Sequence, residues 1–162
     1  MKEIPLTRGK VAIVDDEDYE ELSIVKWHYN HWGYAMRNVT PGGKKRTKIQ
    51  MHIAILGKIE GFEIDHKDGN GLNNRRENLR HVTHTQNTQN KAPYKKTSSR
   101  YKGVSWNKWA NKWVSTIVID GKYYYLGYYK SERDAAWVYN VWAESFFGEY
   151  TRLNVLEASN GK

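Results

Sequence analysis

The chain has 162 residues, with 26 Lys and Arg against 18 Asp and Glu and a formal net charge of +8. Seven Trp and twelve Tyr exclude a disordered polycation, because disordered chains are poor in aromatic residues. The absence of Cys excludes disulfides and thiolate zinc sites, and no signal peptide or long apolar run is recognisable. This composition predicts an intracellular protein with a polyanionic partner, nucleic acid being the first candidate.

Short strands are expected in the first part of the chain, at Lys10–Val14, Lys26–Asn30 and Gly33–Val39. Six of the seven residues in Asp15–Glu21 are acidic, which makes the remainder more basic than the total suggests. A metal site in this run would need the spacing of a calcium loop, which it lacks. A solvated turn leading into a short helix is predicted instead.

A strand, loop, strand and helix are predicted next. Gly61–His66 is the first strand, a turn-rich loop follows, and Asn78–Val82 is the return strand. Thr83 and Gln86 have the spacing of a capping box, which predicts a helix through about Asn90.

The last part is β-rich and then helical. Residues 93–100 read as a basic linker, and three β-rich runs follow from Tyr101, the last two joined by the hairpin signal Asp120-Gly121. Ser131 is predicted to cap a long helix that ends at Gly148. The expected apolar stripe of this helix, on which a three-stranded antiparallel sheet would pack, comprises Ala135, Val138, Tyr139, Trp142 and Phe146.

The polar groups around Asp65 suit phosphodiester hydrolysis, which needs a base for water and a cation to stabilise charge on the phosphate. Asp65 and His66 end a strand, so their side chains point to opposite faces, one for a cation and one for water. Asn87, in the first turn of the next helix, could supply a second oxygen ligand, and Asn78 could orient His66. Oxygen ligands without thiolates favour Mg²⁺, with Mn²⁺ as a substitute.

Two other interpretations of this stretch stay open. The Asx-rich loop could be turn chemistry alone. Alternatively, His81 and His84 could bind zinc together with His52 or His66.

The stretch "EIDHKDGNGLNNRRENLRHVTHTQN" resembles the core motif of HNH endonucleases, specifically the phage and intron-encoded homing enzymes, and "MHIAILG" resembles their lead-in helix. The resemblance implies a ββα-metal site in which Asp65 and Asn87 bind the metal, His66 is the general base and Asn78 positions His66. One departure is Ile53 after His52, where similar proteins carry Arg. Arg75, Arg76 and Arg80 are expected to contact phosphates.

The segment Tyr101–Asn154, including "YKGVSWNKWANKW" and "YYYLGYYKSERDAAWVYNVW", resembles the plant APETALA/ethylene-response-factor DNA-binding domain. The resemblance implies a sheet laid in the major groove. The residues that would face DNA are Lys102, Ser105, Asn107, Trp109, Thr116, Val118, Tyr123 and Tyr125, while Lys95, Lys96 and Arg100 of the linker would contact phosphates. Lys102, Ser105 and Tyr123 stand where the plant domain has arginines, which removes bidentate readout of guanine.

The chain is therefore predicted to be an α+β protein: N-terminal strands and a ββα-metal HNH unit in residues 1–92 (motif 49–92), a linker at 93–100, a sheet-and-helix domain at 101–156 and a tail at 157–162. The predicted function is metal-dependent endonucleolytic cleavage of double-stranded DNA, by nicking or cutting, with no membrane and no protein partner. The expected location is the cytoplasm of a bacterial or phage-infected host cell. A DNA-binding regulator with an inactive nuclease half is the alternative, and an RNA-binding protein is a third.

Overall fold

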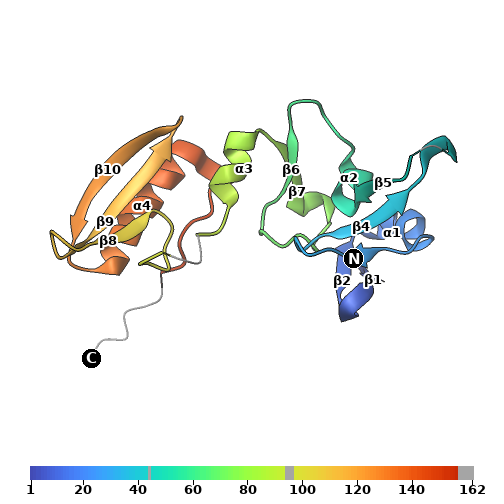
Figure 1. Cartoon of the computed structure of the whole chain (residues 1–162), viewed down its shortest axis with the longest axis horizontal. Coiled ribbons are helices and arrows are strands. Elements are labelled where there is room, and N and C mark those ends of the chain that lie inside the picture. The colour runs from blue at the N-terminus through green and yellow to red at the C-terminus, as the bar shows by residue number, and fades with distance from the viewer. Residues whose placement is uncertain (44, 94–96, 157–162) are drawn as a thin grey trace. The chain divides into compact units, whose positions relative to one another are not determined.

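The structure is a computed structural model and describes residues 1–43, 45–93 and 97–156. The chain divides into two compact units, Met1–Asn87 and the residues from Thr88 onward (Figure 1). It is a mixed α/β protein with several small sheets and few helices, as the α+β class predicted. Within the described ranges, no helix has the length and apolar character needed to cross a membrane.

The first unit begins with two small antiparallel sheets. One pairs β1 (Lys2–Pro5) with β2 (Val11–Val14), and the other has the order β3 (His28–Tyr29), β4 (Ala35–Val39), β5 (Thr47–Gln50). The acidic run forms the helix α1 (Asp16–Ser23), so the predicted turn into a short helix is confirmed. Short 3-10 turns occupy Thr7–Gly9 and Pro41–Gly43.

The segment that carries the candidate site follows in the same unit. It consists of α2 (Met51–Leu56), β6 (Glu63–His66), a 3-10 turn (Arg76–Asn78), β7 (Leu79–Val82) and α3 (His84–Asn90), which continues into the second unit. The predicted capping box is confirmed. The backbone N–H of Thr83 donates to Oε1 of Gln86, and the N–H of Gln86 donates to Oγ1 of Thr83.

The N-terminal sheet supports this segment through one shared core. Met51 of α2 is fully buried among side chains of β1, β2 and β4, including Ile4, Val14 and Ala35. The edge of β2 also holds the loop after β6, because Ile13 N–H donates to the carbonyl of Leu72 and the N–H of Asn74 donates to the carbonyl of Ile13. The loop is thus fixed by backbone bonds from the distant N-terminus.

The second unit is a three-stranded antiparallel sheet covered on one side by a helix (Figure 1). The strands β8 (Val104–Asn107), β9 (Lys112–Ile119) and β10 (Lys122–Tyr129) lie in the order β10-β9-β8, and the helix α4 (Glu132–Phe147) leads into a 3-10 turn (Gly148–Tyr150). Positive φ angles at Asp120 (50°) and Gly121 (75°) confirm the hairpin turn. Oγ of Ser131 accepts the N–H of Asp134, which confirms the cap.

The predicted apolar stripe of α4 is partly wrong. Ala135 and Tyr139 are buried, but so are Ala136 and Ala143, whereas Trp142 and Phe146 are exposed and stack on each other. The small alanine side chains let the sheet pack close to the helix, and the large aromatic residues lie beside the contact rather than in it.

Candidate active site

The end of β6 presents Asp65 and His66 to different surroundings. β6 pairs with β7 so that Asp65 lies opposite Arg80, and Nη2 of Arg80 lies 2.9 Å from Oδ2 of Asp65 in a largely buried ion pair. Because side chains alternate along a strand, Glu63 shares the face of Asp65, whereas His66 points to the other face.

His66 lies in a buried pocket of aromatic rings. The ring centroid of His52, from α2, lies 5.0 Å from that of His66 in an edge-to-face arrangement, and the Tyr34 ring lies 5.7 Å away. Burial lowers the pKa of His66, although the contact with Asn74 and the charges of Asp68 and Asp65 oppose the shift. Burial, with the adjacent His66, lowers the pKa of His52 to about 4. Burial therefore favours the neutral imidazole, the form that accepts a proton.

One nitrogen of His66 is held by Asn74. Nε2 of His66 lies 3.4 Å from Oδ1 of Asn74, whose side chain is fully buried. When the imidazole is neutral and Nε2–H donates to this oxygen, Nδ1 carries the lone pair. Asn74 thus fixes which nitrogen can act as a base.

Asn78 holds the loop between the two strands. Its Oδ1 accepts the N–H of Asp68, and its Nδ2 donates to Oδ1 of Asp68 and to the carbonyl of Asn73. The carbonyl of Asn78 also accepts the N–H of Lys67. An influence of Asn78 on His66 through these bonds would be indirect, because they set the path of the loop that begins after His66.

Asn87 and His84, on α3, meet Glu63 of β6. Nδ2 of Asn87 donates to Oε2 of Glu63, and Nδ1 of His84 lies 2.8 Å from Oε1 of Glu63. Because Glu63 and Asp65 lie on one face of β6, these bonds bring Asn87 to the same face as Asp65. With Nδ2 held by Glu63, the carbonyl oxygen of the Asn87 amide is the atom available to a cation.

The three arginines expected to contact phosphates all bind carboxylates of the chain. Arg80 pairs with Asp65, and Arg75 pairs with Glu77 at 2.6 Å. Arg76 binds both carboxylate oxygens of Asp18 on α1, at 2.9 Å and 2.7 Å. These pairs give the arginines a role in holding the segment together, which the sequence prediction did not include.

The zinc interpretation finds no support in the geometry. Nε2 of His81 lies 3.2 Å from the carbonyl of Gly57, His84 binds Glu63, and His52 packs against His66. In residues 1–43, 45–93 and 97–156 no group of three or more His, Cys, Asp or Glu is placed to hold a metal ion.

In the second unit, most of the residues expected to face DNA lie on the sheet face opposite α4. Pairing places Tyr123 beside Val118 and Tyr125 beside Thr116 on this face, with Ser105 and Asn107 contributed by β8. Trp109, in the turn after β8, is 99% exposed. Lys102 differs, because its Nζ donates to the carbonyl of Gln89. Arg100 stacks on Tyr101, and Lys95 and Lys96 lie outside the described residues.

Comparison with known proteins agrees with this arrangement. A family model described as HNH endonuclease matches residues 51–89, from the start of α2 to the penultimate residue of α3. A protein of Acanthamoeba polyphaga mimivirus named as an uncharacterized HNH endonuclease is 33% identical over 93% of this chain and 78% of its own length. Protein 3.8 of Escherichia phage T7 is 34% identical over 67% of this chain and 89% of its own length. No solved structure matches. The chain belongs to the HNH endonuclease family.

Sequence reasoning did not assign roles to several residues of the site. Glu63 could have been found from strand alternation, because it is two positions before Asp65 and shares its face. Asn74 gave no local signal that separates it from the other Asn residues of the loop. Tyr34 gave none either, because it comes from a turn before β4, far from the motif in sequence.

Proposed function

We propose that this protein is a metal-dependent DNA endonuclease that nicks or cuts duplex DNA, as a homing-type HNH enzyme does. The proposal rests on the arrangement of side chains at the end of β6. There a neutral, buried imidazole with one nitrogen held by Asn74 lies next to Asp65, whose face of the strand also receives Asn87. Membership of the HNH family supports the reaction class and DNA as the substrate.

The residues present fit a hard divalent cation. Asp65 offers carboxylate oxygen, and Asn87 offers an amide oxygen because Glu63 holds its nitrogen. HNH nucleases generally depend on a divalent metal. We assign Asp65 and Asn87 as the protein ligands and Mg²⁺ as the metal, with Mn²⁺ as a substitute. The chemistry that such a cation supplies is stabilisation of negative charge on the phosphate and on the leaving oxygen.

His66 is the proposed general base. Its Nδ1 would take a proton from the attacking water, while Asn74 keeps the ring oriented and burial keeps it neutral beforehand. The positive imidazolium formed in this step lies near Asp65 and Asp68, whose charges stabilise it. Asn78 would maintain the loop that carries these groups.

The second unit is proposed to position DNA, in the manner of the plant domain that its sequence resembles. Support comes from the sheet face opposite α4, where Tyr123 and Tyr125 are exposed, and from the β8–β9 turn, where Trp109 is exposed. A tyrosine has an apolar ring and a polar hydroxyl, so exposed tyrosines on a sheet are suited to contacts with DNA sugars and base edges. Contact with water alone would not favour such large aromatic side chains. Linker residues 93–100 would add phosphate contacts.

The test is incubation with supercoiled and linear duplex DNA in Mg²⁺ and in excess chelator, with Asp65→Asn as the matched variant. Asn keeps the size of the side chain at the Arg80 contact and removes the charge that a cation needs, whereas Ala would also remove the side chain that the largely buried Arg80 binds. Wild type should cleave only with metal, and Asp65→Asn should bind DNA without cleaving it. Cleavage in chelator contradicts metal dependence. No cleavage by wild type under any metal, with DNA binding intact, favours the regulator.

A further inference from the structure

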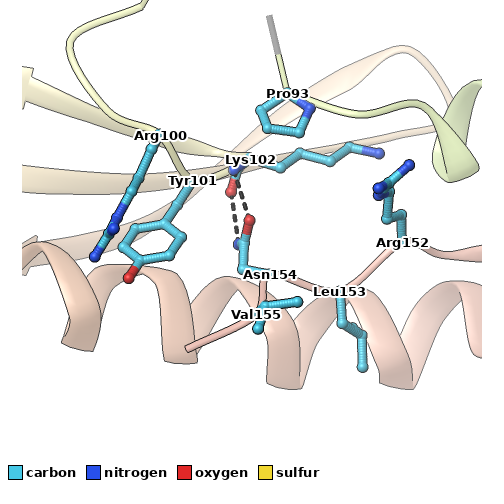
Figure 2. Close-up of a pocket in the computed structure, with 8 residues that line it drawn as sticks. All are labelled: Pro93, Arg100, Tyr101, Lys102, Arg152, Leu153, Asn154 and Val155. Carbon is cyan, nitrogen blue, oxygen red and sulfur yellow. Dashed lines mark hydrogen bonds between the residues drawn. The ribbon is translucent and has the colours of Figure 1, made fainter. Parts of the chain in front are cut away.

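A cluster of positive charge in the second unit lies apart from the exposed sheet face. A cavity of about 210 Å³ is lined by Tyr101, Lys102, Arg152 and Asn154, among others (Figure 2). A molecule in liquid water occupies about 30 Å³, so the cavity has the volume of roughly seven water molecules. This volume is enough for a phosphate group with part of a sugar. Figure 2 shows the side chains of Lys102 and Arg152 extending toward the same side of the cavity, while Arg100 leans the other way.

Three cations make up the cluster: Lys102 and Arg152 line the cavity, and Lys91 is close enough for its charge to act on Lys102. Lys102 is more than half buried, and its pKa falls to about 8 because of burial and the nearby charges of Arg152 and Lys91. Over the described ranges of the chain, none of the three forms an ion pair with a carboxylate. Three like charges without a counter-charge leave a strong positive potential, which an anion would relieve.

The backbone around the cations is firmly held. Asn154 accepts the N–H of Lys102 at 2.7 Å and donates to the carbonyl of Lys102 at 3.0 Å (dashed in Figure 2). Asn140 of α4 makes the same kind of paired contact with the backbone of Asn154, at 2.8 Å in both bonds. The carbonyl of Gln89 accepts both Nζ of Lys102 and the N–H of Arg152. Two segments distant in sequence are thereby locked together, with their cations side by side before any ligand arrives.

We propose that Lys91, Lys102 and Arg152 form a binding site for a phosphate group of the DNA backbone. The inference deepens the proposed function and rests on it, because it assigns a second contact surface on the DNA-positioning unit. Lys91 and Arg152 are exposed and can reach a polymer, whereas Lys102 lies deeper and supplies a partly desolvated charge. Desolvated cations bind phosphate oxygens more strongly than fully solvated ones do.

The experiment measures binding of the full chain to a duplex of arbitrary sequence in chelator, over a series of salt concentrations. Each phosphate contact contributes about 0.9 to the slope of log K against log salt. Arg152→Ala and Lys91→Ala should each lower the magnitude of this slope by about 1. Between about 50 and 200 mM salt, the factor by which each variant loses affinity should therefore be roughly three to four times smaller than the factor for the wild type. Arg152→Lys should retain most of the slope.

Arg133→Ala is the matched control, because Arg133 is an exposed cation of the same unit that neither lines the cavity nor contributes to the lowered pKa of Lys102. Its slope should equal that of the wild type. Slopes for Arg152→Ala and Lys91→Ala that match the Arg133→Ala slope overturn the proposal. The melting curve of each variant checks that the unit is folded, and Lys91→Ala provides the test if Arg152→Ala does not fold.

A second measurement follows the titration of the Lys102 ammonium group by NMR. Bound phosphate stabilises the charged form, so DNA should move the midpoint upward from about 8. If inorganic phosphate moves the midpoint and DNA does not, the site takes a small free anion and the DNA assignment is wrong. Both measurements are made without metal. If the chain binds DNA with these slopes but does not cleave it when Mg²⁺ or Mn²⁺ is added, the nuclease proposal is wrong and the phosphate site still stands.

Discussion

Nε2 of His66 lies 3.4 Å from Oδ1 of Asn74, and Nδ2 of the same Asn74 side chain is buried with no hydrogen-bond partner in the described part of the chain. The contact with His66 is therefore the one hydrogen bond that the Asn74 side chain makes there. A buried amide nitrogen without a hydrogen-bond partner costs free energy, and such a group in a native structure calls for an explanation, a catalytic role being one. This cost is reasonable if Asn74 is retained to orient the imidazole.

Asn74→Ala is accordingly expected to lower the rate of DNA cleavage about tenfold or more, with little effect on DNA affinity. Removing the amide also removes the unpartnered Nδ2, so the loss of stability should be small for so buried a position. The backbone bond from Asn74 to Ile13 is kept. Single-turnover cleavage and DNA binding measure the two effects. Asn70→Ala, in the exposed part of the same loop, is the control, and equal rates for both variants would show that Asn74 does not position the base.

His66→Ala should lower the cleavage rate on the order of a hundredfold or more, which is the usual contribution of a positioned base. Metal and DNA affinity should change little, because His66 is on the other face of β6 from Glu63. His84→Ala is the matched comparison, since His84 contacts the same strand through Glu63, and His81→Ala is a second. Both should retain far more activity. If His66→Ala cleaves normally and His84→Ala is inactive, the general base is His84 on α3 and the assignment of His66 is wrong.

The stability of the first unit should depend on pH through His52. Its pKa is about 4 when folded and about 6.5 when unfolded, so the unfolded chain binds an extra proton between these values. Stability should be fully present above about pH 6.5 and fall as the pH drops toward 4, by up to about 3 kcal/mol. Urea unfolding followed by the methyl signals of Val14 and Met51 measures it. His52→Phe should flatten this dependence in part, and His31→Ala, at an exposed position, should not.

Gly103→Ala should destabilise the second unit much more than Gly121→Ala. Both glycines have φ of +75°, so both substitutions cost about 1–2 kcal/mol in backbone strain. An added Cβ at Gly103 would also lie 2.0 Å from the Tyr139 ring and 2.7 Å from the carbonyl of Thr116, whereas at Gly121 nothing lies within 4 Å. Thermal unfolding followed at Ile117 compares them. Equal losses would mean that Tyr139 can move aside.

Features that are formed by neighbouring residues could be predicted from the amino-acid order. The capping box at Thr83, the N-cap at Ser131 and the hairpin at Asp120-Gly121 are made by groups within a few positions of each other, so their spacing is enough to predict them. The order of Asp65, His66, Asn78 and Asn87 was likewise sufficient to indicate the HNH family, which the family model and the mimivirus relative confirm.

The partner of each charged or buried group depends on how the chain folds. Arg76 is basic and lies in an Asn-rich loop, which predicted phosphate contact, but it binds Asp18, 58 positions earlier in the chain. Other partners are also distant in sequence: Lys102 lies near Arg152, and the rings of Tyr34 and His52 lie near His66. Hydrogen bonds and ion pairs form between groups that the packed core brings within about 3 Å, and sequence separation does not report that distance. Packing likewise exposed Trp142, because alanines allowed a closer contact between α4 and the sheet.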